Sequence, residues 1–232
     1  MNLSWLQSAM LGFVSGLSEP LPLSAEAHRA VLGRIFGTDG YSPLVLFACH
    51  LAALIVVLLT GRLELKRLHR TAKLLKTPPR RRTATPELNS AGTLKLLRTA
   101  LPIAVAGRLL GLYLTTIGEK LYLLTLTLIL GGIILHIPAH MRSANKDGRH
   151  LGKLEAALMG LGFGLSAIPG VSGVGAAVSL GLLLGTDRRY AVRFAWILLC
   201  AGLIASLGID VLSIVGAGVQ FDLSLILSVL VA

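Results

Sequence analysis

Long apolar stretches separated by short polar segments dominate the pattern of this chain. A helix needs about 17–25 apolar residues to cross a bilayer. Four stretches reach or approach that length: Pro43–Thr60, Leu97–Thr116, Leu121–Pro138 and Tyr190–Ile214. This pattern predicts an all-α integral membrane protein with several transmembrane helices.

Two further apolar stretches are interrupted by charged and helix-breaking residues. Trp5–Phe36 is interrupted from Glu19 to His28, and Leu154–Gly185 is interrupted from Pro169 to Gly175. Irregular backbone at membrane depth is tolerated only where protein or a water-filled cavity covers it. We therefore expect both stretches to form re-entrant helix–loop–helix pairs.

The basic residues indicate how the chain is oriented. Half of the 22 Lys and Arg residues lie between Arg62 and Arg98, and two smaller groups lie at Arg142–Lys153 and Arg188–Arg193. Short loops rich in Lys and Arg remain on the cytoplasmic side of a membrane. We expect residues 61–96 to form a basic cytoplasmic loop and the turn at Gly118–Lys120 to lie outside.

This orientation implies an internal repeat. Three crossings separate the two interrupted stretches, so the second one enters the membrane from the opposite side. We expect residues 1–232 to form one polytopic domain with a first half at 1–140 and an inverted, truncated second half at 154–232. An inverted repeat brings the two broken segments together near the midplane.

Composition and charge support a membrane protein. Charged residues make up 14% of the chain and the mean hydropathy is +0.76, whereas a soluble domain carries about 25% charged residues. The net charge of +11 is not accompanied by aromatic residues among the basic ones, so we expect no nucleic-acid binding. The basic segments are expected to contact membrane lipids instead.

The first interrupted stretch carries the most informative residues. An ionisable group at membrane depth, such as Glu19, usually faces a cavity and has a function. A carboxylate, a hydroxyl and an imidazole at Glu19, Ser24 and His28 suit acid–base or nucleophilic chemistry. Glu26 adds a carboxylate that could help to hold a divalent cation. The alternative is that Glu26 and His28 are simply solvated at the outer interface.

The second interrupted stretch offers backbone rather than charge. Gly170, Ser172, Gly173 and Gly175 form a Gly-rich turn before a helix, where exposed N–H groups can bind phosphate. Close packing of membrane helices is the alternative role of these glycines.

Two polar residues inside the apolar stretches need an explanation. His50 lies near the outer side of its stretch. Arg108 lies within a crossing and requires an anionic partner or a cavity, for which Asp210 and Glu119 are candidates.

These motifs resemble the bacterial undecaprenyl-diphosphate phosphatase family. The family pattern E-G-[LI]-[TS]-E-F-L-P-[VI]-S-S-T-G-H corresponds to Ser15–His28, and P-G-x-S-R-S-G corresponds to Pro169–Gly175. The stretch from His50 to Leu54 and the pair Gly131-Gly132 also fit, so the resemblance covers nearly the whole chain in order.

Membership would imply a multi-pass protein of the bacterial plasma membrane, where the family recycles the lipid carrier of wall synthesis. The implied reaction is hydrolysis of a polyprenyl diphosphate to the monophosphate with Mg²⁺ or Ca²⁺. By motif position, Glu19, Ser24, His28 and Ser172 would be catalytic, and Glu19 and Glu26 would hold the metal. The substrate would contact the motif positions Pro22, Gly170, Gly173, Gly175 and His50.

The chain also departs from the family pattern. The motif arginine is Gly173, a neutral threonine is replaced by Glu26, and the chain stops at Ala232 where the family continues. We therefore expect a divergent, C-terminally short member, in which a homodimer can cover the short last stretch Phe221–Ala232. A homologue that binds or translocates a polyprenyl lipid without hydrolysis, or a small-solute transporter, remains an alternative.

Overall fold

The structure, a computed structural model, describes residues 4–38, 41–77, 90–114, 117, 120–140 and 145–218. Within these ranges every regular element is helical. The α-helices are α1 (Trp5–Ser18), α2 (Ala25–Phe36), α3 (Pro43–Thr60), α4 (Arg62–Leu75), α5 (Ala91–Leu110), α7 (Leu121–Ala139), α8 (Lys153–Gly164), α9 (Gly173–Leu183) and α10 (Arg188–Gly216). Two 3₁₀ turns are η3 (Gly111–Tyr113) and η4 (Leu165–Ala167).

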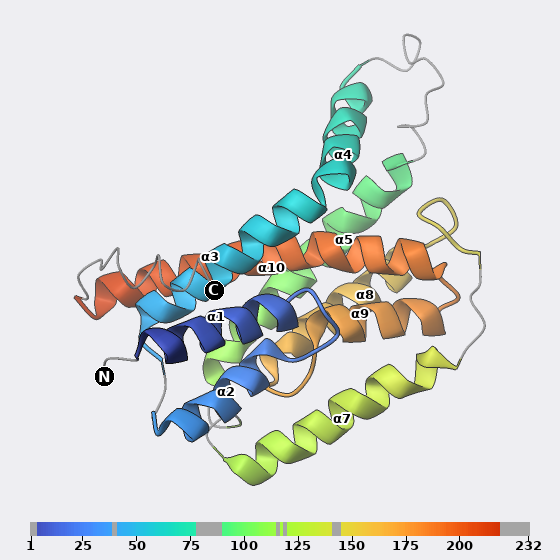
Figure 1. The fold of residues 1–232 in the computed structure, drawn as a ribbon. Helices are drawn as coiled ribbons and strands as arrows, with labels where there is room; N and C mark the ends of the chain where they lie inside the picture. The colour runs from blue at the N-terminus through green and yellow to red at the C-terminus, as the bar shows by residue number, and fades with distance from the viewer. Residues whose placement is uncertain are drawn as a thin grey trace.

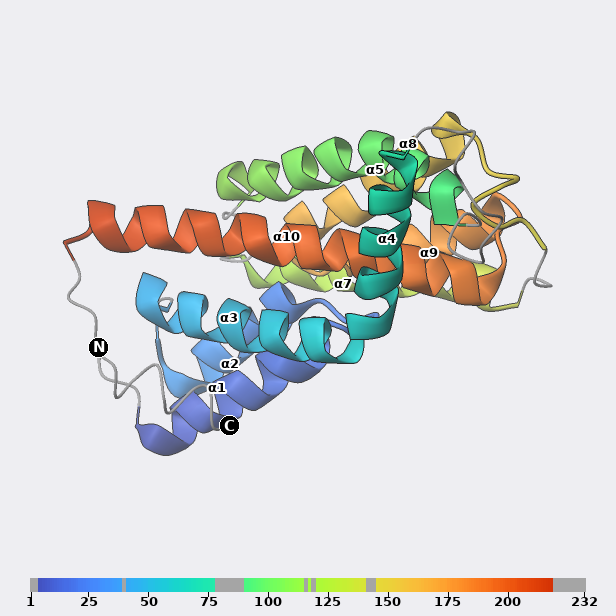
Figure 2. The same ribbon diagram turned by 90° about the horizontal axis from the view of Figure 1, so that it is seen from above.

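Helix α10 is the axis of the bundle. It packs against α3 on one side and against α5 and α9 on the other, and Figure 2 shows it running between α3 and α5. The main core fills the space between these helices and α8, with Met159, Phe194 and Leu198 fully buried. Helix α7 packs on α9 and α1 packs on α2 and α3 (Figure 1).

Both predicted interruptions occur where the sequence places them. Helix α1 ends at Ser18 and α2 begins after Ser24. The 3₁₀ turn η4, which follows α8, ends at Ala167, and α9 begins after Ser172. Each serine accepts a hydrogen bond from a backbone N–H in the first turn of the helix it precedes. A serine cap fixes the start of a helix in this way. The structure therefore confirms the two breaks as helix–loop–helix units.

The length and surface of the helices suit a membrane. By length and composition, α3 and α10 are long and apolar enough to cross a bilayer. Large apolar side chains on the outside of the bundle are exposed on α1, α3, α7 and α10, including Phe13, Leu59, Ile129 and Leu212. Exposed apolar surface of this extent marks a membrane or partner interface rather than a surface in water.

The segment 61–96 differs from the expected loop. Residues 62–75 form helix α4, which continues from α3 after Gly61, and residues 91–96 belong to α5. Helix α4 projects from the bundle (Figure 1) and carries Lys66, Arg67, Arg70 and Lys73. Apolar residues at helical spacing between these charges explain why this basic segment is helical. Glu119 and Phe221–Ala232 lie outside the described residues.

Candidate functional site

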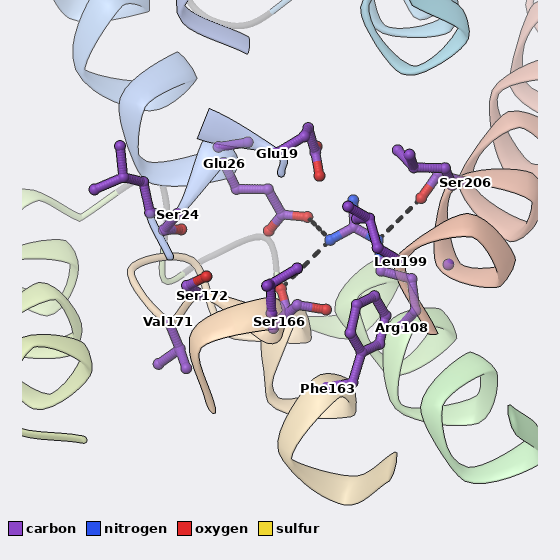
Figure 3. Close-up of a pocket in the computed structure, with 16 residues that line it drawn as sticks. Glu19, Ser24, Glu26, Arg108, Phe163, Ser166, Val171, Ser172, Leu199 and Ser206 are labelled. Atoms are coloured by element: carbon purple, nitrogen blue, oxygen red, sulfur yellow. Dashed lines mark hydrogen bonds and ion pairs between the residues drawn. The ribbon is translucent and has the colours of Figure 1, made fainter. Parts of the chain in front are cut away.

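A cavity lies where the two broken segments meet. It is lined by the first turns of α2 and α9 and by side chains from α5, α8 and α10. Glu19, Ser24 and Ser172, which the sequence singled out, all line it, although about 150 residues separate the two motifs. Its other polar side chains are those of Glu26, Arg108, Ser166 and Ser206 (Figure 3).

Hydrogen bonds join the two breaks directly. Gly170 N–H donates to Ser24 Oγ at 2.9 Å, and Ser172 Oγ lies 3.5 Å from the carbonyl oxygen of Leu21. Gly170 adopts a φ of +108°, a conformation that glycine tolerates and that turns its N–H toward Ser24. The helix starts of α2 and α9 are thus held side by side.

Two helix N-termini consequently border the same cavity. Ser24 Oγ accepts from Ala27 N–H at 3.3 Å, and Ser172 Oγ accepts from Gly175 N–H at 3.1 Å. The amides before these positions lie in the first turns, where backbone N–H groups have no partner inside their helix. The positive ends of two helix dipoles therefore favour an anion in this cavity.

Each carboxylate beside the cavity is paired with an arginine. Arg29 Nη1 donates to Glu19 Oε1 at 3.3 Å, and Arg108 Nη1 donates to Glu26 Oε1 at 2.6 Å. The side chains of Arg29 and Arg108 are 6% and 11% exposed, so both pairs are largely shielded from water. Pairs of this kind fix the positions of both side chains.

Arg108 is held at three points. Besides Glu26, its Nε donates to Ser206 Oγ at 2.9 Å and its Nη1 lies 3.5 Å from the carbonyl oxygen of Ser166. Of the two candidate partners, Asp210 contacts His50 instead. The other candidate, Glu119, lies outside the described residues.

Close helix packing brings Arg108 to this place. A Cβ built on the neighbouring Gly107 lies only 3.0 Å from backbone atoms of Gly164, so α5 and α8 approach through glycine. Small residues permit such contacts between membrane helices. The guanidinium of α5 can therefore extend over the end of α8 into the cavity.

His50 belongs to a buried chain of polar groups behind Glu19. Its Nδ1 lies 2.7 Å from Asp210 Oδ2, and its Nε2 lies 3.8 Å from Glu19 Oε1. In the described part of the chain, Nε2 is a buried atom without a hydrogen-bond partner. His50 thus supports the rear of Glu19 and does not line the cavity.

Of the remaining predicted residues, Gly173 lines the cavity and the others lie around it. The Nδ1 of His28 lies 2.7 Å from the carbonyl oxygen of Ser24, and His28 is not among the lining residues. Gly175 packs toward Pro22 and Leu135, because a Cβ built on it approaches both side chains. Gly173 lines the cavity, with the carbonyl oxygen of Phe163 2.8 Å from a Cβ built on it.

The two carboxylates expected to hold a divalent cation do not fit that role in this structure. Glu19 and Glu26 each already accept a hydrogen bond from an arginine. Within the described ranges, no group of three or more His, Cys, Asp or Glu residues could hold a metal ion. Each arginine engages one oxygen of its carboxylate and places a positive charge beside the other, so the cation stays a prediction from the resemblance alone.

Sequence reasoning missed Ser166 and Ser206 as parts of this site. Ser166 lies in the 3₁₀ turn η4 just before the second break, and its buried Oγ has no partner among the described residues. Ser206 and Asp210 lie four positions apart in apolar α10 and are both buried. Two polar residues on one face of an apolar helix could have predicted that this face of α10 borders a functional site.

Comparison with known proteins shows which family this chain is similar to. Residues 8–232 match the family described as bacitracin resistance protein BacA. The chain is 30% identical over 194 residues to an undecaprenyl-diphosphatase of a Nocardioides species, covering 84% of this chain and 70% of the relative. It is also 30% identical over 213 residues to the undecaprenyl-diphosphatase of Carboxydothermus hydrogenoformans, covering 90% and 74%. A Mycobacterium relative with the same name is 30% identical over 207 residues, covering 88% and 72%.

Proposed function

The chain belongs to the BacA family of membrane proteins, and from this premise we propose that it hydrolyses a polyprenyl diphosphate to the monophosphate. Relatives named undecaprenyl-diphosphatase support this substrate class. We further propose a multi-pass location in the bacterial plasma membrane. The common order of helix, serine-capped break, helix and long apolar helix in α1–α3 and α8–α10 supports an inverted repeat.

One observation carries this proposal: a buried arginine reaches the cavity beside Glu19. A diphosphate needs positive charge near its oxygens, and the motif arginine that would supply it is Gly173 here. Arg108 lines the same cavity from a different helix, together with two helix N-termini. The cavity therefore retains the electrostatics that a phosphate anhydride requires.

The proposed reaction uses water and the cavity's own groups. Water attacks the terminal phosphorus, and the bond from that phosphorus to the bridging oxygen breaks. The bond's electron pair remains on the bridging oxygen, which leaves as part of the lipid monophosphate. Glu19 is the carboxylate beside the cavity that can accept the proton of the attacking water. Arg108 offsets the charge that develops on the bridging oxygen.

Ser24 is better placed to donate a hydrogen bond than to attack. A hydroxyl has two acceptor lone pairs and one O–H donor. Both lone pairs of Ser24 Oγ are engaged by the N–H groups of Ala27 and Gly170. Its O–H remains to bind a phosphate oxygen, so we assign Ser24 to phosphate binding rather than to covalent catalysis.

Phosphate release from undecaprenyl diphosphate by the purified full chain tests the proposal. We expect release by the parent protein and a loss of about 10²-fold or more in Glu19→Gln, since general acid–base groups contribute about 10²–10⁴-fold. Glu64→Gln is the matched control, because Glu64 pairs with Arg67 on the projecting helix α4. Tight binding of the lipid without any release would identify a lipid-binding protein instead.

A further inference from the structure

We propose that buried arginine, rather than a divalent cation, binds the terminal phosphate of the ligand in this chain, and that Arg108 makes the contact. This inference rests on the proposed function, because it takes the ligand to be the diphosphate end of a polyprenyl lipid. It adds that the cavity's positive charge is built into the protein.

The two carboxylates that line the cavity are already paired without a metal. Glu19 and Glu26 lie within 3.3 Å and 2.6 Å of an arginine nitrogen. A third acid, Asp210, is directed at His50 at 2.7 Å. In this part of the chain each carboxylate that lines the cavity has an arginine on one of its oxygens, so a divalent cation on the other oxygen would lie beside a guanidinium and be repelled by it.

One nitrogen of Arg108, Nη2, is left for a ligand. A guanidinium carries five N–H donors in a rigid fork. The Nε edge is fixed by Ser206 and Nη1 is occupied by Glu26 and the Ser166 carbonyl. No described residue accepts a hydrogen bond from Nη2, and Figure 3 shows the guanidinium lying among Glu26, Ser166 and Ser206. The N–H groups of Nη2 suit a phosphate oxygen, because a hydrogen bond between two charged groups is short and strong.

The neighbours of Arg108 tie it to the position where the family motif has its arginine. Ser166, whose carbonyl oxygen lies 3.5 Å from Arg108 Nη1, is also the residue whose side chain lies 2.8 Å from a Cβ built on Gly173. The guanidinium of Arg108 therefore extends from α5 to a place next to Gly173. A side chain at position 173 itself would not fit there. A hydroxyl is also available there, since Ser166 Oγ is buried without a partner among the described residues.

Glu26 acquires a definite role in this account. Its carboxylate accepts the shortest hydrogen bond that Arg108 makes, and its side chain is 29% exposed at the cavity. A phosphate that approaches Arg108 meets this negative charge, so Glu26 competes with the ligand for the guanidinium. If Glu26 were a metal ligand, its charge would instead be needed for phosphate binding. The two accounts predict opposite effects of neutralising Glu26.

The test is the affinity of the detergent-purified full chain for undecaprenyl diphosphate, measured with excess EDTA and with Mg²⁺. We expect dissociation constants that agree within about threefold in the two buffers. Glu26→Gln should bind several-fold more tightly in EDTA, because Gln still accepts a hydrogen bond from Arg108 but carries no charge. Arg108→Gln should bind about 10–100-fold more weakly, the equivalent of a lost charge-assisted contact.

Arg98→Gln is the matched control, because Arg98 is exposed on the same helix, and its affinity should equal that of the parent. Thermal unfolding of each variant establishes that it is folded, and Glu26→Gln keeps the test informative if Arg108→Gln fails to fold. Binding that requires Mg²⁺ and is weakened by Glu26→Gln would overturn the inference while leaving the proposed function intact. No binding by the parent in either buffer would overturn both.

Discussion

The two breaks that meet at the cavity are alike in backbone but opposite in character. The first, between α1 and α2, is partly exposed and is bordered by Glu19, Glu26 and Arg29. The second, between η4 and α9, is mostly buried and has no charged side chain from Leu165 to Leu183. Both place a serine at the start of the following helix and direct that helix's N-terminus at the same cavity.

This difference teaches how the site divides its tasks. The first break supplies ionisable groups, while the second supplies backbone N–H groups, hydroxyls and buried apolar residues. The positive charge that the second break lacks comes from a third element, α5, through Arg108. An arginine on α5 can act on a bound anion much as an arginine on α9 would, because the electric field depends on where the charge lies and not on the helix that carries it.

Removing the charge contributed by α5 should have the largest effect. Arg108→Gln is expected to lower phosphate release by about 10²–10³-fold, the usual cost of one preorganised donor at developing charge. It should also destabilise the protein by about 1–3 kcal/mol, because the partly exposed Glu26 loses its charged partner. Rates of release and thermal unfolding in detergent measure both effects.

The double variant Arg108→Gln/Glu26→Gln separates these two effects. It should recover most of the lost stability, since no charge is then left unpaired, but little of the lost activity. Recovery of both would mean that Arg108 serves only to neutralise Glu26.

The tight wall of the second break should be the next most sensitive feature. A Cβ at Gly173 lies 2.8 Å from the Phe163 carbonyl oxygen and from Ser166 Cβ, so Gly173→Ala should cost about 1–3 kcal/mol of stability through overpacking. Gly208→Ala is the control, because no atom lies within 4 Å of a Cβ there. For the same reason, Gly173→Arg should destabilise the site and not restore a motif arginine.

The two serine caps provide a direct comparison of the breaks. Ser172→Ala should cost about 1 kcal/mol, the typical value of an N-cap. Ser24→Ala should cost more by about 1 kcal/mol, because the 2.9 Å bond from Gly170 N–H to Ser24 Oγ is shorter than the 3.5 Å bond from Ser172 Oγ to the Leu21 carbonyl. Equal losses in thermal or denaturant unfolding would show that the shorter bond between the breaks contributes no more than the longer one.

Charges at the exposed end of the molecule should matter least. Hydrogen bonds from Arg149 and His150 lower the pKa of Asp147 to about 2. Because this pKa lies below the unfolded value of about 3.9, the stabilisation is present above about pH 4 and is lost as the pH falls toward 2. The carboxylate is 34% exposed, so Asp147→Asn should change stability by under about 1 kcal/mol at pH 7. A larger loss would indicate that this loop is coupled to the buried site.

Much of the fold could be predicted from apolar length and helix breakers alone. The stretch Pro43–Thr60 coincides with α3, and both breaks occur at their Pro- and Gly-rich segments. Residues 62–75 were predicted as a loop because their charge was weighed more heavily than the helical spacing of their leucines. Charge reports which side of a membrane a segment occupies, but it does not determine whether that segment is helical.

The candidate site was predicted only where local sequence determines it. Ser24 and Ser172 follow from helix starts, which depend on nearby residues. The partner of Arg108 could not be predicted in this way, because Arg108 and Glu26 are 82 residues apart in the sequence. Their contact depends on how the helices pack. His28 has motif spacing, but the helical turn after Ser24 directs its ring to a backbone carbonyl and not to the cavity.

The position of a bound phosphate tests the central claim most directly. A structure of the full chain determined with undecaprenyl diphosphate, in the Glu19→Gln variant to slow turnover, would locate both phosphorus atoms. We predict that the terminal phosphate lies between the first turns of α2 and α9, within hydrogen-bond distance of Arg108 Nη2. A phosphate bound elsewhere, with Arg108 still contacting only Glu26, Ser166 and Ser206, would contradict the account.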